Sequence, residues 1–123
     1  MLEHVLKALP EEACGLLGGC GEFVEAVLPV TNQMHSPVRF FMEPVELLES
    51  FQWLDKNRLA LLAIYHSHPK GPDQPSATDL ELLWYPGCAQ LIWFPVLDRW
   101  DVKGFFIRKN YTEEINLIFE PDS

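Results

Sequence analysis

One run of seven apolar residues, Leu59 to Tyr65 (LALLAIY), constrains the fold of this chain more than any other feature. The run is far shorter than the ~20 residues of a membrane helix. Its lack of polar alternation is typical of a strand that is covered on both faces. It ends in His66 to Pro75 (HSHPKGPDQP), a loop sequence with three prolines and one glycine. We therefore predict a central strand whose end carries polar side chains out of the core.

Three helices are predicted around this strand. Leu2 to Leu9 has apolar residues at helical spacing and is ended by Pro10. Pro44 to Lys56 begins with a proline suited to the first helical position. Its predicted inner face is formed by Leu47, Leu48, Phe51 and Leu54. Ser76 to Trp84 is predicted as a third helix with Ser76 as its N-cap.

Further strands are predicted on both sides of the apolar run. Ala13 to Leu17 and Phe23 to Val30 form a hairpin through a glycine turn at Gly19 to Gly21, and Pro29 indicates a sheet edge. The other predicted strands are Arg39 to Met42, Ala89 to Val96, Val102 to Lys109 and Tyr111 to Phe119. Strands interspersed with helices predict an α/β fold of three α-β-α layers around a central mixed sheet, in a single domain of residues 1–123.

The amino-acid composition disfavours nucleic acids and membranes as binding partners. The 123 residues carry 9 Lys and Arg against 18 Asp and Glu, a net charge of −9, which disfavours nucleic acid. Three cysteines cannot complete a disulfide framework. The N-terminal segment lacks the apolar core of a signal peptide, and no segment has the length of a membrane span. We therefore expect a cytoplasmic protein with free thiols and no membrane association.

The chemistry is concentrated in the segment that follows the apolar run. His66 and His68 lie at i and i+2, so in extended chain both imidazoles point to the same side. Asp79 lies in the first turn of the predicted helix, which the loop can bring back over the histidines. Two neutral imidazoles and one carboxylate suit one Zn²⁺ per chain and leave the fourth position open for water. Ser76, three residues before Asp79, is a candidate hydrogen-bond donor to an oxyanion, although it can also be only a helix cap.

A hydrolytic zinc site also needs a carboxylate that moves protons. Glu12 is the candidate because it immediately precedes the buried strand that begins at Ala13. Glu11 is the alternative, but strand alternation points it to the other side. Both glutamates can also be solvated residues with no catalytic role.

These residues resemble the JAMM (MPN+) motif of zinc metalloproteases. The pattern consists of an upstream Glu12, then His66-Ser67-His68-Pro69, then Ser76 and Asp79 at the family's spacing. The resemblance implies the MPN/JAB1 fold, which is similar to cytidine deaminases, with His66, His68 and Asp79 as zinc ligands. It implies Glu12 as general acid/base and Ser76 as oxyanion donor. The implied reaction is hydrolysis of a peptide or isopeptide bond next to the C-terminal tail of a ubiquitin-like or sulfur-carrier protein, in a short prokaryotic form.

Three other functions remain open on sequence. One is a related peptidase of phage tails, and another is the DNA-repair-associated RadC group, which favours Asn where this chain has Ser67. The third is a non-enzymatic MPN scaffold or interaction domain, which is disfavoured because all five motif positions are kept. The Gly18 to Gly21 segment lacks the Lys-Ser/Thr of a phosphate-binding loop, which argues against a nucleotide-binding domain.

Overall fold

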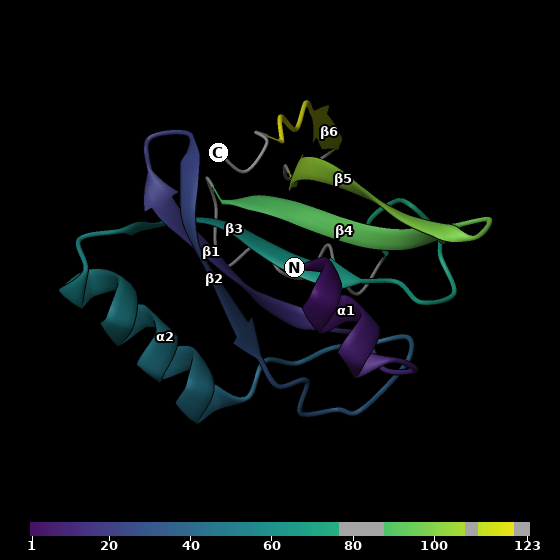
Figure 1. The fold of residues 1–123 in the computed structure, drawn as a ribbon, viewed down its shortest axis with the longest axis horizontal. Helices are drawn as coiled ribbons and strands as arrows, with labels where there is room; N and C mark the ends of the chain where they lie inside the picture. Colours follow the sequence, from purple (N-terminus) through teal and green to yellow (C-terminus); the bar gives the residue numbers. More distant parts are fainter. Residues whose placement is uncertain (77–87, 108–110, 120–123) are drawn as a thin grey trace.

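The computed structural model describes residues 1–76, 88–107 and 111–119. This part of the chain forms two helices and a six-stranded sheet (Figure 1). The helices are α1 (Leu2–Ala8) and α2 (Pro44–Lys56). The strands are β1 (Cys14–Cys20), β2 (Phe23–Val30), β3 (Ala60–Ser67), β4 (Ala89–Val96), β5 (Arg99–Ile107) and β6 (Thr112–Ile115).

The strand order is β2-β1-β3-β4-β5-β6, so the apolar run lies in the interior of the sheet as predicted. β3 pairs in parallel with β4, and every other neighbouring pair is antiparallel, which confirms a mixed sheet. Because β3 continues to Ser67, His66 belongs to the strand itself and not to the loop that follows. β2 forms one edge, which fits the proline near its end.

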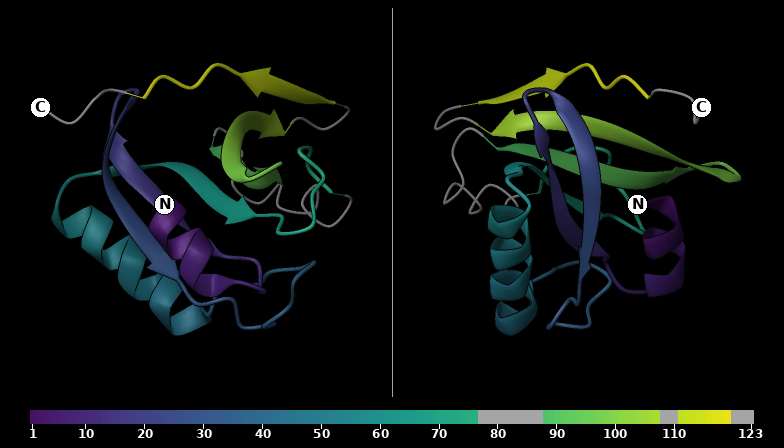
Figure 2. Two further views of the ribbon diagram at one scale, coloured as in Figure 1. Left: turned by 45° about the vertical axis from the view of Figure 1, so that its right-hand side comes forward. Right: turned by 60° about the vertical axis from the view of Figure 1, so that its left-hand side comes forward.

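The two helices lie on opposite faces of the sheet, which confirms the predicted layered α/β arrangement (Figure 2). Leu54, Leu47 and Phe51 of α2 pack on one face, against a cluster that includes Leu16 and Ile64. On the other face, Val5 of α1 packs with Ala13 and Trp93. Both faces of the central strands are therefore covered, as the unbroken apolar pattern requires.

In both helices only part of the apolar stripe is buried, and the inner face predicted for Pro44 to Lys56 is partly wrong. Val5 of α1 is buried, whereas Leu2 and Leu6 of this helix and Leu9, which follows it, are exposed. A two-turn helix at the rim can bury only a narrow stripe, and part of that stripe is His4, which hydrogen-bonds the buried Tyr65. In α2, the buried stripe runs through the i, i+4, i+7 positions of Leu47, Phe51 and Leu54, and it leaves Leu48 exposed.

The predicted strand from Arg39 to Met42 is also wrong. A single β-bridge joins Met42 to Asn32. The Arg39 carbonyl and the Phe41 N–H are hydrogen-bonded to the side chain of Asn32, so they are not paired with a neighbouring strand. The predicted helix from Ser76 to Trp84 lies, beyond Ser76, outside the described residues. Among the described helices, none has the length and apolar character needed to cross a membrane.

Candidate metal site

The end of β3 and the start of β1 place three titratable side chains together. Cys14 pairs with His66 in the antiparallel register, which brings Glu12 opposite His68. The ligand atoms of Glu12, His66 and His68 all lie within 4.8 Å of one another. All three side chains are buried. A buried carboxylate beside two imidazoles is a group able to hold a metal ion.

The two imidazoles have the geometry of a ligand pair. Their Nε2 atoms are 3.1 Å apart. Two nitrogens bound to one tetrahedral zinc at ~2.0–2.1 Å would lie roughly 3.3 Å apart, so almost no movement is needed. His68 Nδ1 lies 2.8 Å from the carbonyl oxygen of Pro72, which can only accept a hydrogen bond. This bond places the proton of neutral His68 on Nδ1 and its lone pair on Nε2, the tautomer that ligates through Nε2.

Ser67, between the two histidines, joins the strands that carry the site. Its Oγ accepts a 2.8 Å hydrogen bond from the backbone N–H of Ala13, and its own N–H donates to the Ala13 carbonyl at 3.0 Å. Ser67 is fully buried. Because Ala13 follows Glu12 directly, this pair of bonds fixes the backbone of Glu12 relative to both histidines.

Asn32 holds the other side of Glu12, a role that the sequence analysis missed. Its buried amide donates to the carbonyl oxygens of Glu12 at 3.1 Å and Arg39 at 2.9 Å. Its Oδ1 accepts from the N–H groups of Met34 and Phe41, both at 3.1 Å. One side chain therefore ties Glu12 to the loop of residues 33–41. The only sequence signal was an isolated Asn in a polar, turn-rich segment.

The same loop presents an aromatic ring to the site. Phe40 stacks on the imidazole of His66 with ring centroids 4.6 Å apart and planes 27° from parallel. The stacked ring limits rotation of His66 and excludes water from one side of it. Beside His66, its partner across the two strands, burial raises the pKa of the Cys14 thiol to about 12, with further contributions from the negative charges of Glu12 and Glu46. Cys14 is therefore a neutral, buried neighbour of His66.

The structure brings only some of the predicted site residues together. Glu12, His66 and His68 are brought together, whereas the alternative Glu11 lies beside His35, with Oε1 3.2 Å from Nδ1. Ser76 is half-buried and is the last described residue before the gap. Asp79 lies outside the described residues.

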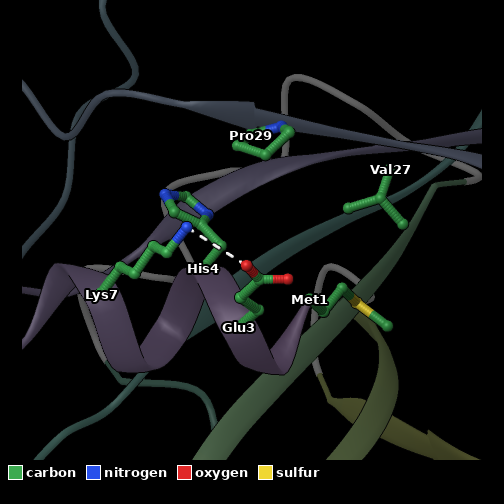
Figure 3. A pocket seen from close by; sticks show the side chains of 6 residues that line it. All are labelled: Met1, Glu3, His4, Lys7, Val27 and Pro29. Atoms are coloured by element: carbon green, nitrogen blue, oxygen red, sulfur yellow. Dashed lines mark ion pairs between the residues drawn. The ribbon is translucent and has the colours of Figure 1, made fainter.

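A cavity of about 370 Å³ lies elsewhere, between α1 and the edge strand β2 (Figure 3). His4 lines it together with Met1, Val27 and Pro29, and a 3.1 Å ion pair between Lys7 and Glu3 lies at its rim. His4 hydrogen-bonds Tyr65, whose side chain points to the face of β3 opposite His66. The cavity is therefore separate from the histidine cluster.

Known proteins share this fold. A solved structure from Desulfitobacterium hafniense is 38% identical and superposes with a TM-score of 0.88, covering 99% of this chain and 87% of that one. A JAB1/MPN domain protein from Archaeoglobus fulgidus is 22% identical, with a TM-score of 0.59 over 94% of this chain and 86% of its own. The second likeness is one of fold alone.

Sequence relatives carry names of peptidases. A desampylase of Pyrococcus furiosus is 31% identical over 96% of this chain and 88% of its own length. A probable TtuB-protein conjugate cleaving protease of Thermus thermophilus is 44% identical over 63% of this chain, and the match spans only 53% of that protein. A CysO-cysteine peptidase of Mycobacterium tuberculosis is 32% identical over 70% of this chain and 60% of its own.

A family model described as prokaryotic homologs of the JAB domain matches residues 1–107. The match includes both histidines of the cluster and the glutamate beside them. The chain therefore belongs to the prokaryotic branch of the JAB (JAMM/MPN) domain family.

Proposed function

We propose that this chain is a zinc-dependent hydrolase that cleaves a peptide or isopeptide bond next to the C-terminal tail of a ubiquitin-like or sulfur-carrier protein. The observation that carries the proposal is the buried cluster of Glu12, His66 and His68, with the two Nε2 atoms 3.1 Å apart. Relatives named as a probable TtuB-protein conjugate cleaving protease and as a CysO-cysteine peptidase support this class of substrate.

In this proposal His66 and His68 are two ligands of one zinc ion, and Asp79 is the third. The Pro72 carbonyl supports the assignment for His68, because it holds the proton on the nitrogen that faces away from the cluster. Zinc bound there would acidify a water molecule and polarise the scissile carbonyl.

Glu12 is the proposed proton carrier. Its carboxylate lies within 4.8 Å of both histidine nitrogens, close enough to accept a proton from the attacking water and to return it to the leaving amine. Its backbone is held by Ser67, through Ala13, and by Asn32. General acid/base catalysis needs a carboxylate held in a fixed position, and these hydrogen bonds fix the backbone that carries it. Ser76 is the proposed hydrogen-bond donor to the oxyanion.

We further propose that the chain works as one domain of residues 1–123 in the cytoplasm. The three cysteines, Cys14, Cys20 and Cys88, form no disulfide, which fits a reducing compartment. The net charge of −9 favours a protein partner with a basic surface over a nucleic acid.

The test is cleavage of defined conjugates. Zinc-loaded protein is incubated with ubiquitin-like carriers that bear either C-terminal extensions or lysine-linked proteins, and the products are identified by mass spectrometry. The proposal predicts a cut directly after the carrier's terminal residue. A His68→Ala variant, which lacks a ligand, serves as the inactive control. Intact conjugates throughout, with zinc bound, would favour a scaffold and contradict the proposal.

A further inference from the structure

A row of paired residues crosses the sheet from the metal cluster to β5. Cys14 of β1 pairs with His66, His66 pairs with Ile92 of β4, and Ile92 pairs with Lys103 of β5. Residues paired in this way present their side chains on the same face of a sheet. Lys103 therefore rises from the face that carries the histidines, two strands away from His66.

Lys103 reaches the loop that follows the second histidine. Its Nζ donates a 2.6 Å hydrogen bond to Oδ2 of Asp73, and the two charges form an ion pair. The ammonium also lies 5.7 Å from the ring centroid of Phe94, a favourable cation–π position. The hydrogen bond from Lys103 lowers the pKa of Asp73, and the same bond raises the pKa of Lys103. Both groups are thus charged at neutral pH.

The loop between His68 and Asp73 is tied back onto His68 twice. The N–H of Gly71 donates to the His68 carbonyl at 2.8 Å, and His68 Nδ1 donates to the Pro72 carbonyl at 2.8 Å. Gly71 has a positive φ of 70°, which glycine adopts without strain. Asp73 directly follows Pro72, so the ion pair anchors the residue next to the carbonyl that orients His68.

We infer that Lys103 is a positioning residue for the metal site: through Asp73 it holds the Pro72 carbonyl against His68 Nδ1, and so keeps the Nε2 lone pair directed at the metal position. The inference rests on the proposed function, because it takes His68 to be a zinc ligand. No motif pointed to this role, since the partners are thirty residues apart.

The direction in which zinc affinity changes in Lys103→Met distinguishes a positioning role from a purely electrostatic effect. Lys103 is a cation on the same face as the histidines, so its charge repels a bound Zn²⁺ through space. If that repulsion were its only effect, Lys103→Met would tighten zinc binding. If Lys103 positions His68, the same substitution weakens zinc binding. Contacts that orient a metal-bound histidine are worth roughly 10–100-fold in metal affinity. Lys103 does not contact His68 directly but acts through Asp73, in an ion pair that is partly exposed to solvent. We therefore expect Lys103→Met to lower zinc affinity by about three- to tenfold.

The experiment measures two properties of Lys103→Met and Asp73→Asn. The first is zinc affinity, by competition with a chromophoric chelator. The second is the tautomer of His68 in metal-free protein at mildly alkaline pH, from the ¹⁵N shifts of its ring nitrogens. Both variants should bind zinc more weakly and lose part of the Nδ1–H tautomer, and the double variant should be no worse than either single one. Lys103→Arg should retain wild-type values. The control is Lys7→Met, which makes the same substitution in a more exposed lysine–carboxylate pair on the other face of the sheet.

The positioning role of Lys103 requires that both zinc affinity and the His68 tautomer change in Lys103→Met. Unchanged or tighter zinc binding in Lys103→Met would overturn it, and so would weaker binding with an unchanged His68 tautomer. If the wild-type protein binds no zinc at all, the proposed function fails, and the tautomer of metal-free Lys103→Met alone decides the positioning role.

Discussion

Replacing Ser67 by alanine tests how the site is held together. The substitution removes the oxygen that accepts the N–H of Ala13, and the surroundings of Ser67 are fully buried. A buried donor left without an acceptor costs about 1–3 kcal/mol, so the free energy of unfolding should fall by that amount. The second bond, from the Ser67 N–H to the Ala13 carbonyl, remains. The chain should therefore still fold, with a looser start to β1.

Catalysis should suffer more than stability. Glu12, the proposed proton carrier, precedes the freed peptide, and a displacement of ~1 Å in a catalytic group can reduce the rate by as much as 10²-fold. We expect kcat/KM to fall by about 10- to 100-fold while zinc stoichiometry is unchanged, because neither histidine loses a contact.

The assay is urea unfolding of metal-free protein, so that zinc binding adds nothing to the measured stability. Kinetics of the zinc-loaded form follow on the same preparations. Ser50→Ala is the matched control. It removes a hydroxyl that bonds the Glu46 carbonyl within α2, and the free energy of unfolding should change by less than about 0.5 kcal/mol. If Ser67→Ala matched wild type in both stability and activity, the hydrogen bond between the Ala13 N–H and Ser67 Oγ would have no role in positioning Glu12.

Three further predictions follow from buried contacts. Asn32→Asp removes the amide that donates to the backbone carbonyls of Glu12, Ser36 and Arg39, and it should lower the free energy of unfolding in urea by at least about 2 kcal/mol. An unchanged free energy of unfolding would show that Asn32 does not hold Glu12 to this loop. Burial raises the pKa of Cys14 to about 12, so iodoacetamide at mildly alkaline pH should alkylate the exposed Cys20 and leave Cys14 unmodified in a peptide map; equal labelling would refute this. Gly15→Ala places a Cβ 2.5 Å from the Tyr65 ring and should lower the melting temperature, with a cost of about 1–3 kcal/mol; an unchanged melting temperature would show that the ring can move.

Local chemistry made several elements predictable from the sequence. α2 begins at Pro44 as predicted, and Glu43 caps it by accepting the N–H groups of Val45 and Glu46. The unbroken apolar run identified the central strand because an interior position in the sheet leaves no face for polar residues. That Glu12 rather than Glu11 lies beside the histidines was also predictable, since strand alternation puts Glu12 on the face that Cys14 shares with His66.

Other features depend on contacts that no local pattern encodes. Asn32 meets Glu12 only because β2 returns beside β1, and Phe40 reaches His66 only because the loop folds around Asn32. The pair of Lys103 and Asp73 joins residues thirty positions apart. The exposure of Leu6 and Leu48 was missed for a related reason, because helical spacing defines an apolar stripe but not how much of it the neighbouring layer covers.

The role of Glu12 in the proposed hydrolysis is tested most directly by comparing Glu12→Gln with wild type in two properties, zinc content and hydrolysis of a ubiquitin-like carrier fusion. Gln is nearly isosteric with Glu but cannot accept and return a proton. If Glu12 is the proton carrier, both proteins bind one zinc per chain and hydrolysis falls by at least 10²-fold in the variant, as expected for loss of a general acid/base. Loss of zinc from Glu12→Gln would make Glu12 a ligand, and full activity would remove it from catalysis; either result would contradict the proposed role of Glu12.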